Sequence, residues 1–167
     1  MKKYIVIVAI VLVLLIMISK KSESEVISTF KTSQATINKV NTYQSLISNA
    51  SQAHNIPVSR IKAHIAVESA GNPNANGSAG EVGLMQMKAA ALQDVNKRFL
   101  SNAPLKLFDL YEAGYSIASG AAYLRILFEQ LGTLDKASMA YNSGADNISS
   151  KKAKTYLEKI LAYEKLL

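Results

Sequence analysis

The chain has 167 residues, a formal net charge of +7 and no cysteine. A chain of this length predicts one domain with one buried core, and the lack of cysteine excludes disulfides, thiolate metal sites and a lipid-attachment cysteine. Four lysines within residues 1–21 carry more than half of the net charge and leave 15 basic and 12 acidic residues elsewhere, so the composition also excludes a nucleic-acid-binding surface.

An apolar run of fifteen residues, Tyr4 to Ile18, opens the chain between two pairs of lysines. The run is slightly short for a spanning helix, but lysines can snorkel from both ends, and no small-residue cleavage site follows it. We predict an uncleaved transmembrane anchor over residues 1–21 that contacts the lipid bilayer through residues 4–18; the alternative is a cleaved signal peptide. The lysines are balanced across the run, so they do not orient it.

Residues 22–40 are rich in Ser, Thr and Lys and contain neither Pro nor Gly. We predict a solvated tether with helical leanings that holds the following domain clear of the membrane. The alternative is a thin apolar seam of Val26, Phe30, Ile37 and Val40, which would make the segment an oligomerisation stalk.

Residues 41–167 carry the pattern of a single all-α domain. Apolar residues recur at helical spacing, strand signals are nearly absent, and the loop at 72–83 has the Asn, Gly and Ser content of a short hairpin. The segments that we predict as helices are 42–53, 57–71, 84–99, 113–131, 134–142 and 151–166. Helices of this kind pack on one another around one core.

Glu68 lies on the apolar face of the second predicted helix, where a buried residue is expected. Val58, Ile61 and Ile65 recur at steps of three and four, and Glu68 is the next position on that face. A carboxylate on an apolar stripe is costly to ionise, so we expect its pKa to rise, as a general acid requires. The alternative is a glutamate at the frayed end of a surface helix, since Gly71 ends the helix within a turn.

Four short motifs follow one another along this domain. They are Glu68-Ser69, Gly83-Leu84-Met85-Gln86, Ala140-Tyr141-Asn142-Ser143-Gly144, and Tyr156 on the last helix. In this order they resemble the lytic transglycosylases related to goose-type lysozyme. The resemblance implies a lysozyme-like transglycosylase fold for residues 41–167 and peptidoglycan glycan strands as the substrate.

Lytic transglycosylases of this kind work with one glutamate, which is first the acid and then the base. The acetamido group of the sugar assists, its 6-hydroxyl attacks, and the product is a 1,6-anhydromuramyl end. The resemblance therefore assigns cleavage of the β-1,4 bond between N-acetylmuramic acid and N-acetylglucosamine to Glu68. We expect no cofactor, and the two histidines have no carboxylate or thiolate at the spacing of a metal site.

The resemblance also implies roles for residues around the acid. Tyr141 would reach the carboxyl of Glu68 with its phenol, and Asn142 would brace the turn that follows. Tyr156 would close the cleft from the last helix. Ser69 would fix the end of the Glu68 helix.

The second motif would form the wall of the cleft. Gly83 would let the backbone approach the sugar closely. Leu84, Met85 and Gln86 would begin a helix that lines the cleft, with Gln86 hydrogen bonded to a sugar. Ser78, in the loop before this motif, would contact the acetamido group.

Acidic residues near the motif bear on the choice between transglycosylation and hydrolysis. Goose-type lysozymes that hydrolyse carry acidic residues before and just behind this motif, where this chain has Gly77 and Lys88. These departures favour the transglycosylase. Glu81 stands where the family usually has alanine, so a hydrolytic muramidase in which Glu81 positions a water stays open. A peptidoglycan-binding assembly protein is a further alternative.

His64 lies one turn before Glu68 and could tune its carboxyl. A lone histidine on a helix is more often partly exposed and inert, which is what we expect for His64. We expect His54 in a loop.

Peptidoglycan lies outside the membrane, so we expect the N-terminus inside. The catalytic domain is then expected on the peptidoglycan side of a bacterial cell membrane or a virion membrane. Small anchored proteins of this kind serve envelope-spanning machines and membrane-containing phages, and the sequence does not choose between these partners.

Overall fold

The structure, a computed structural model, describes residues 25, 28, 31 and 33–167. The chain divides into two units, residues 1–35 and residues 36–167, and all of the named helices lie in the second unit. Among the described helices, none has both the length and the apolar character needed to cross a bilayer. The anchor that we predict over residues 4–18 lies outside the described residues.

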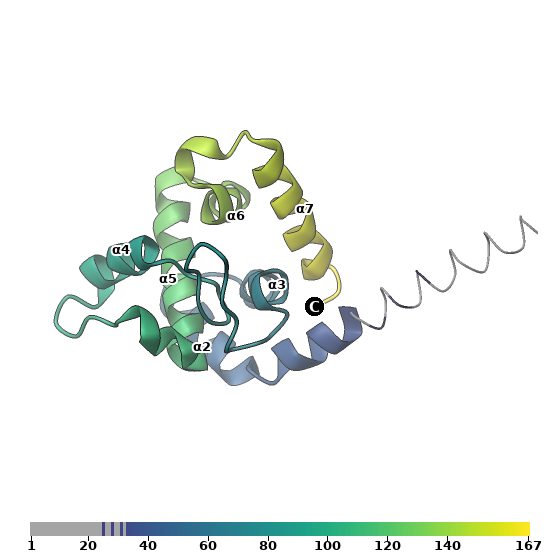
Figure 1. Cartoon of the computed structure of the whole chain (residues 1–167). Helices are drawn as coiled ribbons and strands as arrows, with labels where there is room; N and C mark the ends of the chain where they lie inside the picture. Colours follow the sequence, from purple (N-terminus) through teal and green to yellow (C-terminus); the bar gives the residue numbers. More distant parts are fainter. Residues whose placement is uncertain (1–24, 26–27, 29–30, 32) are drawn as a thin grey trace, which may run out of the picture. The chain divides into compact units, whose positions relative to one another are not determined.

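The second unit is built from helices, as predicted, and the all-α class is confirmed (Figure 1). Within residues 36–167, β-structure is limited to two isolated bridges, Asn76 to Val82 and Val82 to Met87. The elements are α2 (Gln44–His54), α3 (Val58–Ser69), α4 (Ala89–Phe99), η1 (Leu107–Tyr111), α5 (Ala113–Leu131), α6 (Leu134–Ser143), η2 (Ala145–Asn147) and α7 (Lys151–Glu164).

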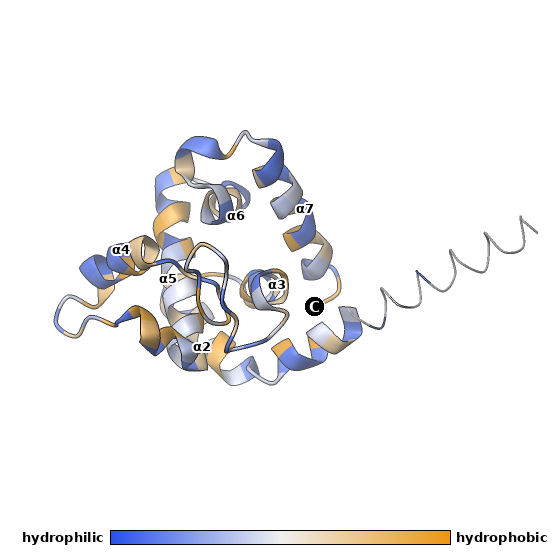
Figure 2. Cartoon of the chain, in the orientation of Figure 1, coloured by the Kyte–Doolittle hydropathy of each residue, from blue (hydrophilic) through white to orange (hydrophobic). Residues whose placement is uncertain are grey.

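The long helix α5 is the centre of the packing. It contacts α2, α3, α4 and α6, while α7 packs on α3 and α6 (Figure 1). Small side chains line its buried face, and a Cβ on Gly120 would lie only 2.6 Å from the Met85 side chain. In contrast, hydrophilic residues cover much of α7 (Figure 2). The main core therefore includes the contact between the second motif and α5, together with apolar residues of α2, α3 and α4.

The segment 84–88 is not helical, so the prediction of a helix from Leu84 onward was wrong. Val82 and Met87 exchange two backbone hydrogen bonds, of 3.1 and 3.2 Å, and Gln86 takes a left-handed conformation with φ of 46°. The chain closes on itself at this point, and helix α4 begins only at Ala89. The motif thus forms a tight loop instead of a first helical turn.

The compact unit begins at Thr36, within the segment that we predict as a tether. Residues 36–41 are helical, and the Val40 side chain is fully buried in the main core. Val40 therefore contributes to the domain itself.

Candidate active site

A cleft of 330 Å³ opens beside the last turn of α3. Its walls come from the loop 81–88, the start of α4, the end of α6 and the start of α7. The lining residues are Glu68, Glu81, Gln86, Met87, Lys88, Ala90, Ala91, Tyr123, Ala140, Tyr141, Asn142, Ser143, Gly144 and Lys152. The cleft thus brings together residues of three of the four motifs, and Glu68 is the residue at which α3 reaches it.

Glu68 is placed by the way in which α3 ends. Ala70 and Gly71 both adopt left-handed backbone conformations, with φ of 51° and 76°, so the helix stops one residue after Glu68. The Ser69 hydroxyl donates to the Ile65 carbonyl at 3.2 Å, in keeping with its predicted role at the helix end. Ile61 and Ile65 are fully buried, so Glu68 continues a buried face of α3.

The carboxyl of Glu68 keeps its proton to a much higher pH than an ordinary glutamate and is about half protonated near pH 7. Burial raises its pKa to about 7, and the hydrogen bond that it accepts from Tyr156, at 2.5 Å, opposes this rise. The negative charge of Glu81 raises the pKa further, whereas Lys152 lowers it. The rise predicted from the apolar stripe is confirmed, and Glu68 has the properties of a general acid.

Glu81 lines the same cleft, but its carboxyl is ionised and ion paired. Its carboxylate accepts from the backbone N–H of Ala79 at 2.9 Å and pairs with Lys88 at 3.0 Å. Hydrogen bonds from its own backbone N–H, and then from Lys88, lower its pKa. The two carboxyls of the cleft therefore have pKa values shifted in opposite directions, and Glu68 is the one that can hold a proton near neutral pH.

The tyrosine that hydrogen bonds to Glu68 is Tyr156, so the prediction that the Tyr141 phenol reaches this carboxyl was wrong. The Tyr141 hydroxyl donates to the Met85 carbonyl at 2.7 Å, and its ring packs edge to face against His64 and Tyr123. Burial raises the pKa of both phenols well above the usual value, so both remain hydrogen-bond donors. Tyr141 ties α6 to the second motif, whereas Tyr156 brings a donor from α7 to the acid.

Most of the second motif lies in the core behind the cleft wall, and only Gln86 of this motif lines the cleft. Leu84 and Met85 are fully buried, and neither lines the cleft, so the predicted contacts of their side chains with substrate were wrong. A Cβ on Gly83 would lie 2.1 Å from the Leu110 carbonyl oxygen. The glycine is therefore required by the packing of η1 against the loop, where we had predicted an approach to sugar.

Gln86 lines the cleft, but its side-chain amide already donates hydrogen bonds to the backbone. The Nε2 group donates to the carbonyls of Ala75 and Gly83, both at 2.9 Å, which holds the loop closed. Asn142 also lines the cleft, and its Oδ1 is buried with no hydrogen-bond partner among the described residues. Ser78 is exposed in the loop outside the cleft, and its contact with substrate stays a prediction.

The structure adds two cleft residues with polar side-chain groups that the sequence analysis missed, Lys152 and Tyr123. Lys152 lies one turn before Tyr156 on α7, a spacing that places both on one face of the helix. Tyr123 comes from α5 and packs against Tyr141. The spacing on α7 was a usable signal for Lys152, whereas nothing in the sequence marks Tyr123.

The fold and the site define a lysozyme-like domain whose cleft contains one partly buried carboxyl with a raised pKa. Comparison with known proteins gives the family: residues 45–163 match the model of the transglycosylase SLT domain. The chain belongs to this family.

Three relatives illustrate the similarity. The transglycosylase of Enterobacteria phage PRD1 is 29% identical over 122 residues, which are 72% of this chain and 42% of the phage protein. The 70-kDa soluble lytic transglycosylase of Escherichia coli has a TM-score of 0.68 at 24% identity. An inactive Glu-to-Gln mutant of lytic transglycosylase Slt from Pseudomonas aeruginosa has a TM-score of 0.67 at 22% identity. The match covers 73% of this chain and 23% of each of the two bacterial proteins, and it shows a shared fold.

Proposed function

We propose that the protein cleaves the β-1,4 bond between N-acetylmuramic acid and N-acetylglucosamine in peptidoglycan, leaving 1,6-anhydromuramyl ends. Glu68 gives its proton to the glycosidic oxygen as the bond from that oxygen to C1 breaks. The Glu68 carboxylate then takes the proton of the 6-hydroxyl as that oxygen bonds to C1. The two steps return Glu68 to its protonated form, and water is not consumed.

The observation that carries this proposal is the state of Glu68. Its carboxyl has a pKa of about 7 and hydrogen bonds to Tyr156, and both properties suit a group that acts as acid and then as base. The second carboxylate of the cleft is held by Lys88 and by a backbone N–H of its own loop. A single-glutamate reaction is therefore the chemistry that this site supports best.

The product distinguishes this reaction from hydrolysis. We expect that sacculi digested with the purified full-length protein release muropeptides with anhydro ends, each one water lighter than the reducing-end product. Mass spectrometry of the released fragments measures this difference. Fragments with only reducing ends would replace the transglycosylase by a muramidase.

The Glu81→Ala variant tests the muramidase alternative, which rests on the presence of Glu81 in the cleft. A hydrolytic enzyme needs a carboxylate to hold its water, whereas the 6-hydroxyl needs none. We expect Glu81→Ala to keep the anhydro product and most of the rate. Lys88→Ala is the matched control, because it removes the other half of the same ion pair. Loss of the product with Glu81→Ala alone would assign a catalytic role to Glu81.

We also propose that residues 4–18 anchor the protein in a bilayer with the catalytic domain on the peptidoglycan side. The similarity to a phage transglycosylase favours a virion over an envelope-spanning machine as the setting. The full-length protein should stay with membranes after high-salt and alkaline washes, because salt does not weaken a hydrophobic attachment. Recovery of a soluble protein whose N-terminus follows Ser19 would instead show a cleaved signal peptide.

A further inference from the structure

A line of hydrogen bonds runs from Glu68 into the interior of the domain. Tyr156 donates to Glu68 at 2.5 Å, and the same hydroxyl lies 3.0 Å from Nδ1 of His64. Nε2 of His64 lies 3.0 Å from the Ser138 hydroxyl, which accepts from Arg60 at 2.9 Å. His64 and Ser138 are fully buried, so the prediction of a partly exposed His64 was wrong. None of these interior residues lines the cleft.

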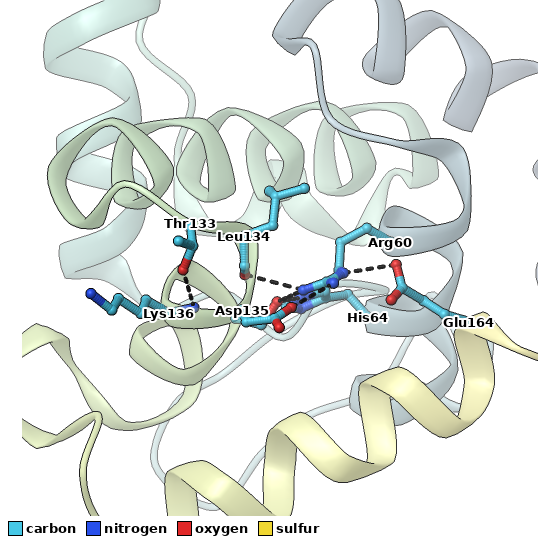
Figure 3. A network of polar contacts seen from close by, with 8 residues as sticks. Arg60, His64, Thr133, Leu134, Asp135, Lys136 and Glu164 are labelled. Atoms are coloured by element: carbon cyan, nitrogen blue, oxygen red, sulfur yellow. Dashed lines mark hydrogen bonds and ion pairs between the residues drawn. The ribbon is translucent and has the colours of Figure 1, made fainter.

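Arg60 is fixed at the inner end of this line by two other helices. Its guanidinium donates to Glu164 of α7 at 2.8 Å and to Asp135 of α6 at 2.9 Å (Figure 3). It also donates to the backbone carbonyl of Leu134 at 3.1 Å. The Arg60 side chain is only 7% exposed, so its position and its charge are both set by the fold.

The donor and acceptor properties of these groups determine in which direction the hydrogen bonds along the line point. A guanidinium can only donate, so the Ser138 oxygen accepts from Arg60 and the Ser138 proton is left for Nε2 of His64. Burial, and then the positive charge of Arg60, lowers the pKa of His64 to about 3, so the ring is neutral and has one N–H. If Nε2 accepts the Ser138 proton, that N–H must be on Nδ1, from which it points to the Tyr156 oxygen 3.0 Å away. The single phenolic proton of Tyr156 is then directed to Glu68.

The other tautomer of His64, with the proton on Nε2, leaves the Ser138 hydroxyl proton without an acceptor. With the proton on Nε2, the Ser138 oxygen would receive two donors, and its own proton would need an acceptor. A serine in a helix often donates to the carbonyl four residues earlier, here that of Leu134. The two lone pairs of this carbonyl already face the Arg60 guanidinium and the backbone N–H that closes the first turn of α6. Nδ1 of His64 would also compete with Glu68 for the phenolic proton. Such an arrangement is costly in a buried site.

We propose that Arg60, Ser138 and His64 are positioning residues that direct the hydroxyl proton of Tyr156 at Glu68. This inference rests on the proposed role of Glu68 as the acid. A donor fixed in this direction stabilises the carboxylate that remains after Glu68 has given up its proton, and so eases the first proton transfer, to the glycosidic oxygen. The other charged or titratable groups that face Glu68 are Glu81 from the loop, Lys152 from α7 and Tyr141 from α6.

The tautomer of His64 is the first test, and it needs no substrate. The chain has two histidines, so nitrogen NMR of the labelled full-length protein resolves both rings, and a His54→Gln variant assigns them. We expect His64 to stay neutral between pH 5 and 8 with its proton on Nδ1. A proton on Nε2, or a ring that gains a second proton in this range, would overturn the proposal.

Buried serines provide a matched pair of variants for the second test. Ser138→Ala breaks the line, whereas Ser119→Ala removes a buried hydroxyl on α5 that has no hydrogen-bond partner among the described residues. We expect Ser138→Ala to raise the pKa of Glu68, followed by carbon NMR of its carboxyl, and to slow sacculus lysis by roughly tenfold. Ser119→Ala should change neither quantity. Equal pKa values for Glu68 in the two variants would contradict the proposal.

Replacement of the histidine separates positioning from packing. His64→Asn keeps an amide donor near the place of Nδ1, whereas His64→Leu keeps only the bulk. We expect the pKa of Glu68 to be close to the wild-type value in the Asn variant and to be higher than the wild-type value in the Leu variant. Should the wild type lack lytic activity, the proposed function fails, while the tautomer and the carboxyl titration still decide the direction of the hydrogen bonds.

Discussion

Replacing Glu68 with Gln is expected to slow sacculus lysis by about 10²–10⁴-fold, because the variant has no proton to donate. The amide is nearly isosteric with the acid and still accepts the hydrogen bond from Tyr156. Lysis is measured as the initial rate of turbidity loss. Glu158→Gln, on an exposed part of α7, is the control and should retain full activity. A Glu68→Gln rate within a few-fold of wild type would refute the assignment of the acid.

The same variant should be more stable than the wild type at alkaline pH. The pKa of Glu68 is raised from 4.5 to about 7 by folding, so below pH 4.5 the acid is protonated in both states and costs nothing. Between pH 4.5 and about pH 7, Glu68 is ionised in the unfolded chain but still protonated in the folded protein. The free energy of unfolding of the wild type therefore falls as the pH rises through this range. Above pH 7 the loss amounts to about 3 kcal/mol, which a neutral Gln avoids. Unfolding by urea at pH 4 and at pH 8 measures the difference.

Gly83→Ala is expected to lower the free energy of unfolding by about 2–4 kcal/mol. The residue has a φ of 75°, and its new Cβ would lie 2.1 Å from the Leu110 carbonyl oxygen and 2.8 Å from the Ser116 hydroxyl. Backbone on both sides must move to relieve this contact, which shifts the loop that walls the cleft. Urea unfolding measures the loss.

Gly80→Ala isolates the close contact from the backbone strain. Gly80 has a similar φ of 82°, but its Cβ would meet nothing within 4 Å. We expect this control to lose only about 1 kcal/mol. Equal losses in the two variants would show that the packing of η1 against the loop is not what requires Gly83.

Local patterns predicted the helices well where they have clear ends. The predicted range 113–131 matches α5 to the residue, because Gly132 ends it in a left-handed conformation. The helix of Glu68 and its raised pKa also followed from spacing alone. The loop 84–88 was predicted as helix because its apolar residues fit both patterns, and only the backbone pairing of Val82 with Met87 decides between them.

Contacts between distant segments set the limit of prediction at the site. Whether Tyr141 or Tyr156 meets Glu68 depends on where α6 and α7 lie, and no local pattern carries that information. Arg60, His64 and Glu68 recur at steps of four, so one face of α3 already displayed both ends of the hydrogen-bonded line. The two other members of the line are Tyr156 of α7 and Ser138 of α6, and nothing in the sequence distinguishes Ser138 from other serines.

The bond between Glu68 and Tyr156 joins residues that are 88 positions apart. A ribosome adds about 5–20 residues per second, so the acid is made roughly 4 to 18 seconds before its donor exists. Throughout that interval α3 has no α7 to pack against, and Arg60 lacks Glu164. The nascent chain therefore has Glu68 without its hydrogen-bond donor until the last helix docks on α3.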